Sequence, residues 1–523
     1  LRSYGAEGQL TSVSFRGTTP NQTQVSWKGI DVNSQTLGQS DFSSIPSFLF
    51  NSVSLHHGAS STLFGSGAVG GVVDLTNKMQ SGIFAQINQQ IGSFGKVFTG
   101  VKGQFSTFRW GVQIAGVRNR VENNFEVDFR GDSYEQNNAA SSLNGITGEA
   151  FMKFGSSKMT ASLWLNEHDR EAQPIIGFLN AQDHLLDRNF RSNLSFETAL
   201  SPGYLDVSLA YVDDRQTYND GSVTNLKRLV FNGEFEFEPI RNWSSRVGTN
   251  FTHGSPEVSA YESVANQIRW DAFLLNQWKA TERLNLTANL RLPYQEFQDK
   301  IPLVPSIGAE YLFIDNSERD LLGAIRGARS FRFPTFNDLY WTPGGNKDLQ
   351  PEDGYTVESS WKLEERTSYI KLNAALSGYM TRISEMIVWV PSGSFWSPQN
   401  VQTVRIRGVE SELSISKSYK KWSWRIHGTY AYNHSENTEL STQLPYVPFH
   451  KASVVTDIRW LNWNLTYLET FTGMRYTENT NTSELSGFQV AQLSLGHDLH
   501  FGDHVINMTF QVKNLWDEAY QNY

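Results

Sequence analysis

Alternation of apolar and polar residues over short segments is the feature that most limits what this chain can fold into. Residues 284–292 place Leu or Ala at every even position and Asn, Thr or Arg at every odd position. Successive side chains of a β-strand point to opposite faces, so one face of this segment is wholly apolar and the other wholly polar. Similar alternation recurs in residues 108–114, 205–211, 231–238 and 370–376. The chain is therefore expected to consist of many two-faced strands.

The connections between these segments have the composition of turns. Clusters of Asn, Asp, Gly, Ser and Pro lie between them, and the sequence shows no amphipathic helical pattern of useful length. A soluble β-sandwich or a β-propeller would also alternate. A propeller should show a repeat of about 40 to 50 residues, which this sequence lacks. No second type of domain is recognisable after residue 80.

Composition favours a membrane barrel over a soluble β-protein. Mean hydropathy is −0.42, and no window approaches the roughly 18 to 20 consecutive apolar residues that a membrane helix needs. Aromatic residues nevertheless make up 13% of the chain. A polar average with many aromatic residues is expected of a transmembrane β-barrel, whose lumen and loops are wet and whose interfaces carry aromatic girdles.

Charge and cysteine content argue against several function classes. The formal net charge is −9, so the basic footprint of a nucleic-acid-binding protein is missing. The sequence has no cysteine, which excludes a disulfide scaffold, a thiolate metal site and a cysteine nucleophile. An enzyme in a membrane barrel would need a catalytic constellation at the rim. The spacing of Ser43, Ser44 and His450 does not mark catalysis, so we expect no enzymatic activity.

The first 80 residues differ in kind from the rest. They contain short strand-like runs broken by Gly and Asn, and residues 58–77 are rich in glycine and small side chains. Residues 65–70 read G-x-G-x-x-G, but no helical pattern follows, as a dinucleotide-binding fold requires. Gly65, Gly70 and Gly71 permit positive φ and close backbone approach, and glycine-rich turns can act as hinges.

Several motifs, in the right order, resemble the TonB-dependent outer-membrane transporters. Arg16-Gly17 resembles the family's Arg-Gly turn. The family's Gly-Ser-x-Ala-x-Gly-Gly element is similar to Gly65, Ser66, Ala68, Gly70 and Gly71. Three later stretches, residues 329–353, 405–413 and 514–520, resemble segments of the family's barrel. The spacing from Val13 to Leu75 is most similar to that of the cobalamin-transporter branch.

The resemblance implies an all-β fold: an antiparallel transmembrane barrel of about 22 strands with an N-terminal plug inside its lumen. We expect the plug at residues 1–79 and the barrel at residues 80–523. This leaves roughly 20 residues for each strand and its connection. In the family, an energy-coupling segment precedes the position of Leu1, and a last strand follows the 514–520 element. We therefore expect the N-terminal part of the plug and the last strand to lie outside the given sequence.

Five residues are expected to pack or hinge the plug: Arg16, Gly17, Gly65, Gly70 and Gly71. The chain departs from the family at His57-Gly58-Ala59, where many members have Arg-Gly-Pro with an acidic residue three positions earlier. The charged contact that locks the plug in those members is not expected at this position. His56 and His57 point to opposite faces of a strand, so they are not expected to share a metal ion or haem.

The function implied by the resemblance is active import of a scarce, bulky nutrient across the bacterial outer membrane. It requires a TonB-type energy-coupling partner in the inner membrane. Cobalamin, a ferric siderophore or haem could be the cargo. A passive outer-membrane channel is the alternative of a different class, but a channel does not need a plug. Lipid, lipopolysaccharide and a lipoprotein cap on the cell surface are the further partners considered, and nucleic acid is not among them.

The loop at residues 33–39 is expected to cap the plug on its outer side. It offers amides, hydroxyls and one apolar side chain but no charge. Such a loop suits cobalamin, which is large, nearly neutral and rich in amides, better than an anionic ferric chelate. The predicted ligand contacts are Asn33, Ser34, Gln35, Thr36, Leu37 and Gln39. For Asn33 and Ser34, a role as turn formers is an equal alternative.

An acidic stretch at residues 167–187 is the candidate metal site. Its density of carboxylates suits the hard oxygen coordination of Ca²⁺, and the cobalamin branch includes members that use calcium to order outer loops. The predicted ligands are Glu167, Asp169, Asp183 and Asp187. A solvated acidic loop is the alternative, and no cofactor is expected to be required.

Overall fold

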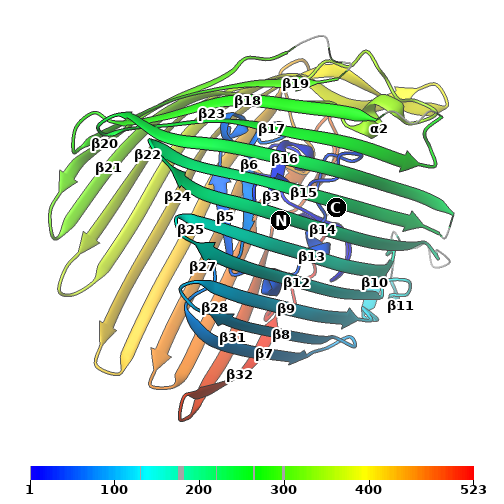
Figure 1. Cartoon of the computed structure of the whole chain (residues 1–523). Coiled ribbons are helices and arrows are strands. Elements are labelled where there is room, and N and C mark those ends of the chain that lie inside the picture. The colour runs from blue at the N-terminus through cyan, green and yellow to red at the C-terminus, as the bar shows by residue number, and fades with distance from the viewer. Residues whose placement is uncertain are drawn as a thin grey trace.

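The structure is a small mixed sheet enclosed by a large antiparallel barrel (Figure 1). This computed structural model describes residues 2–129, 131–174, 182–219, 221–262, 266–296, 298 and 301–522. The barrel sheet contains 22 strands, of which β26 (Thr442–Gln443) is a two-residue strand at the end of β25 (Trp422–Asn437). The prediction of an all-β barrel with an internal plug is confirmed.

Neighbouring wall strands are antiparallel; β9 pairs with β12 across the intervening hairpin, and in the strand order the last wall strand, β32, comes next to the first, β7. The first wall strands are β7 (Gly82–Ile91), β8 (Val97–Ser106), β9 (Trp110–Val121), β12 (Ser141–Phe154), β13 (Ser157–Glu171), β14 (His184–Leu200), β15 (Gly203–Tyr218), β16 (Ser222–Ile240), β17 (Trp243–Val258), β18 (Gln267–Lys279) and β19 (Leu284–Gln295). Those that follow are β20 (Val304–Asp315), β21 (Arg319–Arg332), β22 (Glu352–Arg366), β23 (Lys371–Ser392), β24 (Phe395–Tyr419), β27 (His450–Trp460), β28 (Trp463–Thr472), β31 (Phe488–Phe501) and β32 (His504–Lys513).

The two ends of the barrel differ in their connections. At one end, the short-turn end, neighbouring strands join through tight turns such as Gly155-Ser156. At the other, the long-loop end, connections carry the hairpins β10 (Glu126–Phe129) with β11 (Asp132–Glu135) and β29 (Arg475–Tyr476) with β30 (Glu484–Leu485), and helix α2 (Phe336–Tyr340). Figure 1 shows the tight turns to the left and α2 to the right. None of the helices in the described residues is both long and apolar enough to cross a membrane.

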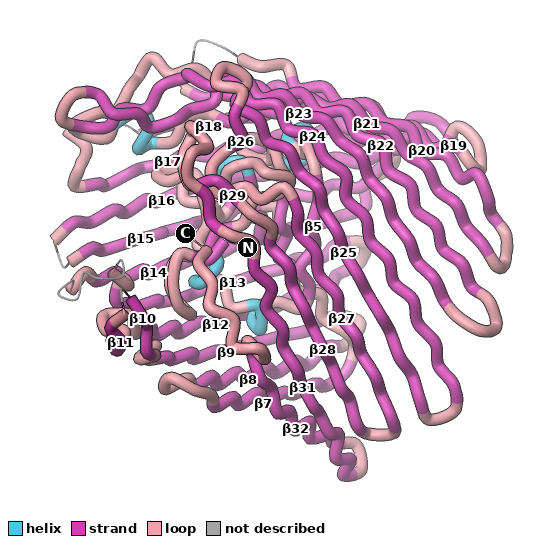
Figure 2. Tube along the Cα trace, turned by 180° about the vertical axis from the view of Figure 1, so that it is seen from behind, coloured by secondary structure: helices cyan, strands magenta, loops and turns pink. Residues whose placement is uncertain are grey.

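The plug contains a four-stranded sheet in the order β4-β3-β6-β5; Figure 1 labels β3, β5 and β6 inside the barrel, and Figure 2 shows β5 from behind. Its strands are β3 (Thr23–Trp27), β4 (Ile30–Asp31), β5 (Ser52–His57) and β6 (Gly71–Thr76); the smaller elements are β1 (Arg2–Ser3), β2 (Thr11–Ser12), the 3-10 turns Pro20–Gln22, Phe42–Ser44 and Ser47–Leu49, and helix α1 (Ser61–Phe64). β3 and β6 are parallel, and Val25 faces Val73 in their register. Their apolar side chains pack with Trp164 of the wall, so this part of the plug and the barrel share a core.

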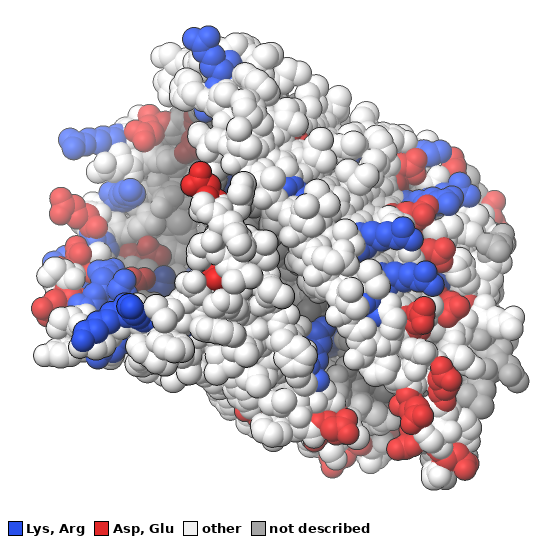
Figure 3. Space-filling view, turned by 90° about the horizontal axis from the view of Figure 1, so that it is seen from below, with Lys and Arg blue, Asp and Glu red and all other residues white. Residues whose placement is uncertain are grey.

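Side chains alternate across the wall as the sequence predicts. In β19, Arg291 faces the lumen and is 1% exposed, whereas Leu292 faces outward and is 45% exposed. Charged side chains gather toward the two ends of the molecule, with a largely uncharged band between them (Figure 3). Tryptophans at strand ends next to tight turns form the expected aromatic girdle: Trp110, Trp243, Trp278, Trp422, Trp460 and Trp463.

A buried arginine joins the plug to the wall. The guanidinium of Arg16 donates to Glu358 of β22 at 2.8 and 3.0 Å and to Glu410 of β24 at 2.9 and 3.0 Å. It also lies 4.2 Å from the centre of the Tyr379 ring. Burial lowers the pKa of Arg16, but the two carboxylates more than offset this and raise it, so the group stays charged. The sequence predicts no charged contact between plug and wall at His57. In the structure, Arg16 makes such a contact.

Several glycines of the plug let its backbone come close to neighbouring residues. Gly17 has φ +73°, and an added Cβ would collide with Asn433 and Ser435 of β25. An added Cβ at Gly70 would collide with Thr18, and one at Gly71 with the carbonyl of His56 and the ring of Phe15. Gly65 has φ +93° and ends helix α1. These contacts support a packing role, and the hinge role stays a prediction.

Replacing Leu290 with arginine should lower the free energy of unfolding by about 2 to 4 kcal/mol, because Leu290 lies midway along β19 on the lipid-facing side. Urea titration in lipid vesicles measures this. Thr287→Arg is the matched control, since Thr287 lies on the lumen side of the same strand, and its loss should be clearly smaller. Equal losses in the two variants would contradict the assignment of faces.

Replacing Arg16 with alanine should destabilise the plug by about 3 to 5 kcal/mol, because it leaves two partly buried carboxylates without their cation. Hydrogen exchange of the plug amides in the detergent-solubilised protein measures the loss. Arg319→Ala is the control, since it removes an exposed pair with Glu365 that should contribute about 1 kcal/mol or less. Unchanged plug protection in Arg16→Ala would show that this contact does not hold the plug.

Candidate functional site

The loop at residues 33–39, here called the crest loop, lies against α2 at the long-loop end. The backbone carbonyls of Gln35 and Thr36 accept the amides of Phe336 and Asn337 at 3.0 and 3.2 Å. Helix α2 is fixed in turn by a capping box, in which Thr335 and Asp338 satisfy each other's backbone amides. The crest loop is therefore attached to a barrel loop as well as to the plug sheet.

Asn33 holds the crest loop together from inside. Its Oδ1 accepts the amide of Val25 at 3.0 Å and the hydroxyl of Ser40 at 2.8 Å. Its Nδ2 donates to the carbonyls of Thr23 and Gly38 at 2.8 and 3.2 Å. Because every donor and acceptor of this 5% exposed side chain is used, Asn33 is not a ligand contact. The sequence-based prediction for Asn33 is wrong, and the turn-forming alternative describes its role.

The other predicted crest residues lie on two sides of the loop. Four of them, Ser34, Thr36, Leu37 and Gln39, line a small pocket against the barrel wall, here called the crest pocket. Gln35 turns away and lines a different cavity deeper in the lumen. The hydroxyls of Ser34 and Thr36 lie 2.7 Å apart and bond to each other, whereas Leu37 is 45% exposed. Gln39 is thus the crest amide best placed for a ligand in this pocket.

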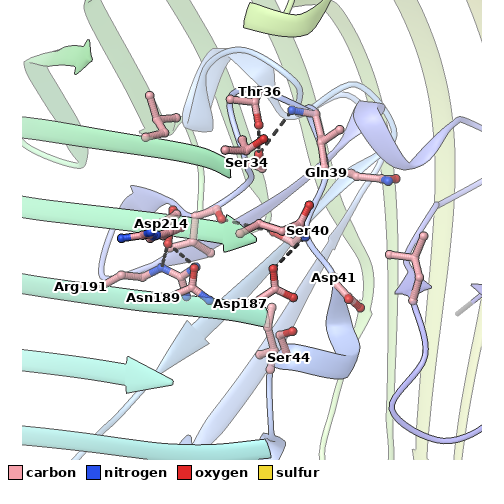
Figure 4. Close-up of a pocket in the computed structure, with 18 of the residues that line it drawn as sticks. Ser34, Thr36, Gln39, Ser40, Asp41, Ser44, Asp187, Asn189, Arg191 and Asp214 are labelled. Atoms are coloured by element: carbon pink, nitrogen blue, oxygen red, sulfur yellow. Dashed lines mark hydrogen bonds and ion pairs between the residues drawn. The ribbon is translucent and has the colours of Figure 1, made fainter. Parts of the chain in front are cut away.

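The wall of the crest pocket comes from strands β13 to β16 near the long-loop end. Figure 4 shows Ser34, Thr36 and Gln39 on the plug side, and Asp187, Asn189, Arg191 and Asp214 on the side of β14 and β15. The volume is about 130 Å³. Pockets that enclose a drug-sized ligand hold roughly 300 to 1,000 Å³, so this one can receive only part of a large molecule. It forms a floor beneath the outer loops.

Charges in the crest pocket are balanced. The charged lining residues are three arginines and three aspartates: Arg170, Arg191, Arg215, Asp41, Asp187 and Asp214. Arg170 pairs with both Asp41 and Asp187, the latter at 3.1 Å. Arg191 donates to Asp214 at 2.8 Å. A buried charge that is paired is not available to a ligand without loss of its partner, so Arg170 and Arg191 are not free cations. The third arginine, Arg215, is exposed and forms no ion pair with the described residues.

The four predicted calcium ligands do not converge. Glu167 and Asp169 point outward from β13, where they pair with Arg188 at 2.8 Å and His184 at 2.6 Å. Asp187 points into the lumen, and Asp183 accepts the amide of Asn219 at 2.7 Å beyond the strand end. Side chains on a strand alternate between faces, which separates residues that are close in sequence. The prediction of a calcium site built from Glu167, Asp169, Asp183 and Asp187 is therefore wrong; residues 175–181 of this stretch lie outside the described part.

A second acidic group is also occupied by protein partners. Asp41, His168 and Asp187 place three possible ligand atoms within 4.8 Å of one another. Arg170 already pairs with both carboxylates. The two ring nitrogens of His168 lie 2.8 Å from the hydroxyls of Ser44 and Ser141. This group is a closed ion-pair and hydrogen-bond network that fastens the plug to β13 and β14.

The serines and the histidine considered for catalysis have separate partners. Ser43 bonds to Asp41 at 2.7 Å, and Ser44 bonds to His168. His450 lies on β27 and bonds to the hydroxyl of Tyr430 at 2.9 Å. The absence of enzymatic activity stays a prediction.

Sequence reasoning did not identify Arg170, Arg191 and Asp214 as lining residues. Alternation along residues 157–171 shows that Arg170 shares a face with His168 and Trp164. It does not show which of the many strands the crest loop approaches, since that depends on how the plug is rotated in the barrel.

Two family models match this chain. The model described as "TonB dependent receptor-like, beta-barrel" matches residues 109–515, and "TonB-dependent Receptor Plug Domain" matches residues 1–72. The chain is 24% identical over 543 aligned positions to the vitamin B12 transporter BtuB of Photobacterium profundum, covering 99% of this chain and 84% of that protein. It is 22% identical over 451 positions to BtuB of Vibrio vulnificus, covering 79% of this chain and 67% of that protein.

Among solved structures, the siderophore receptor PirA from Acinetobacter baumannii is similar with a TM-score of 0.80 and 16% identity. The match covers 99% of this chain and 90% of that one. At this identity, the similarity shows a shared fold.

Replacing Asn33 with alanine should loosen the crest loop, because it leaves the buried amide of Val25 without its acceptor. The expected loss of local stability is about 1 to 3 kcal/mol. Hydrogen exchange at residues 34–38 measures it. Gln39→Ala should leave this exchange unchanged, since no side-chain bond from Gln39 supports the loop. Exchange at residues 34–38 that is as slow in both variants as in the unaltered protein would contradict the structural role of Asn33.

Proposed function

The chain belongs to the TonB-dependent receptor family, and from this premise we propose that its cargo is a bulky, nearly neutral nutrient, most specifically a corrinoid such as cobalamin. The protein is an outer-membrane transporter of this family. In outer-membrane barrels, short turns face the periplasm and long loops face the exterior. The crest pocket therefore lies on the external side, where cargo arrives.

The balanced charge of the crest pocket is the observation that supports a neutral cargo. An anionic ferric chelate would need unpaired cations, but Arg170 and Arg191 are held by aspartates in this pocket. Amide and hydroxyl groups from the crest loop remain to bind a ligand that carries many amides. The cargo would rest on the crest pocket with one of its side groups inserted, because the pocket is too small for the whole molecule.

The relatives support the same cargo. Two of them, at 24% and 22% identity, are named vitamin B12 transporters. The siderophore receptor PirA has a similar fold at 16% identity, which does not bear on the cargo of this chain. A ferric siderophore or haem is the alternative cargo, and the binding experiment below separates it from a corrinoid.

Transport requires that the plug respond to an inner-membrane partner. The plug closes the lumen through contacts such as Arg16 with Glu358, and Arg291 with the carbonyls of Thr62 and Leu63 at 3.0 and 2.9 Å. A passive channel requires an open lumen, and a lumen closed in this way would block diffusion. A TonB-type partner would supply the force that displaces these contacts, whereas a lipoprotein cap and lipopolysaccharide stay predictions.

Calorimetry of the purified protein with cyanocobalamin, a ferric siderophore and haem tests the cargo. Cyanocobalamin should bind, and Gln39→Ala should weaken its binding by about 1 kcal/mol, the net value of one neutral hydrogen bond. Gln35→Ala is the matched control, since this amide belongs to the same loop but faces the other cavity. Tight binding of the siderophore or haem, with none of cyanocobalamin, would reject the corrinoid and leave the family assignment intact.

A further inference from the structure

Two cavities lie in series between the plug and one side of the barrel wall. The middle cavity, about 480 Å³, runs from Gln35 of the crest loop past Asp31 to Lys28, along strands β15 to β18. The periplasmic cavity, about 880 Å³, runs from Lys28 to Gly155 and Ser156 in the tight turn between β12 and β13. The two cavities share three lining residues: Lys28, Asp206 and Ser208. Together they follow the plug from the crest loop to the periplasmic end.

One ion pair spans the junction of the two cavities. Lys28 of the plug pairs with Glu149 of β12, and the side chains are 18% and 8% exposed. Ser162 of β13 also donates to Glu149, at 3.3 Å. This pair is a contact between plug and wall at the point where one cavity ends and the other begins.

Lys28 has a positive φ, a backbone conformation that lysine rarely adopts. The residues Lys28 and Gly29 form the two-residue turn between β3 and β4, and they have φ of +55° and +76°. Positive φ at both positions is the geometry of a type I′ turn, which favours Asn, Asp or Gly. The flanking residues Trp27 and Ile30 are buried, so the turn is firmly anchored. Backbone strain of this kind is concentrated at functional sites, so the side chain of Lys28 is inferred to make a functional contact.

The opposite side of the plug is attached by Arg16. Arg16 binds two carboxylates on β22 and β24 and stacks on Tyr379. In the strand order, β12 and β22 lie roughly half the barrel apart. On the seam side the plug is also held by Arg170 with Asp41 and by the core at Trp164, and the Lys28–Glu149 pair is the contact at the junction of the two cavities.

We propose that the seam along β12 to β18 is the route by which cargo passes the plug, and that the Lys28–Glu149 pair is the contact that closes it. This inference rests on the proposed import function and adds the position of the path. When the Lys28–Glu149 pair parts under a pull on the plug, the two cavities merge into one passage while Arg16 keeps the far side attached. Asp206, which lines both cavities, offers Lys28 a second carboxylate during this movement.

Potassium chloride conductance of the purified protein in planar bilayers tests the closing contact without cargo or partner. Lys28→Asn keeps a residue that the turn favours but removes the cation, so a steady basal current should appear that the unaltered protein lacks. Glu149→Lys should produce the same current. The double variant Lys28→Glu with Glu149→Lys restores an ion pair with reversed charges, and the current should be lost again.

Lys153→Asn is the matched control, because Lys153 lines the periplasmic cavity but contacts the rings of Phe108 and Phe151 instead of the plug. It should stay closed. A closed Lys28→Asn variant, an open control, or a charge-swapped double variant as conductive as the single ones would each overturn the proposal. Since the test uses only potassium chloride, its result does not depend on whether the cargo is a corrinoid.

Discussion

A strand in a bilayer has no water to satisfy its backbone amides and carbonyls, so every wall strand needs a hydrogen-bonded neighbour on each side. Antiparallel pairing from strand to strand around the barrel, as between β9 and β12, answers this requirement. Closure creates a lumen, and period-two alternation makes that lumen polar wherever the outside is apolar. The plug therefore has to pack against a polar wall, and most of its attachments are hydrogen bonds and ion pairs.

Wall arginines show how this interface is built. Arg228, Arg291 and Arg326 donate to plug carbonyls of Asp31, Thr62 and Ala59 at 2.9, 3.0 and 2.7 Å, respectively. Water can replace these hydrogen bonds when plug and wall separate. The free energy of separation is therefore smaller than the number of hydrogen bonds suggests. Among the described residues, apolar packing joins plug and wall in two places: Trp27 and Phe50 of the plug meet Trp164 of β13, and Val69 of the plug packs with Ile383 and Val404 of β23 and β24. A plug attached in this way is stable at rest and can still be displaced by an applied force.

The parts of this fold that depend on local pattern could be predicted from the sequence. Alternation at residues 284–292 indicated which side chains of β19 face the lumen, and the glycine element at residues 65–71 indicated a plug. Contacts that depend on how the plug sits in the barrel could not be predicted. Arg16 reaches Glu358 and Glu410, which lie more than three hundred residues away in sequence. The sequence does not reveal the role of Asn33, because an amide in a loop can bind its own backbone as readily as a ligand.

Cargo bound above the closed plug is expected to pass it only when an energised inner-membrane partner acts. Uptake of radiolabelled cyanocobalamin by cells that produce the protein, with and without a protonophore, tests this most directly. Surface binding should persist and uptake should stop when the inner membrane is de-energised. Uptake that continues at the same rate without the proton gradient would contradict this expectation and would identify the barrel as a passive channel.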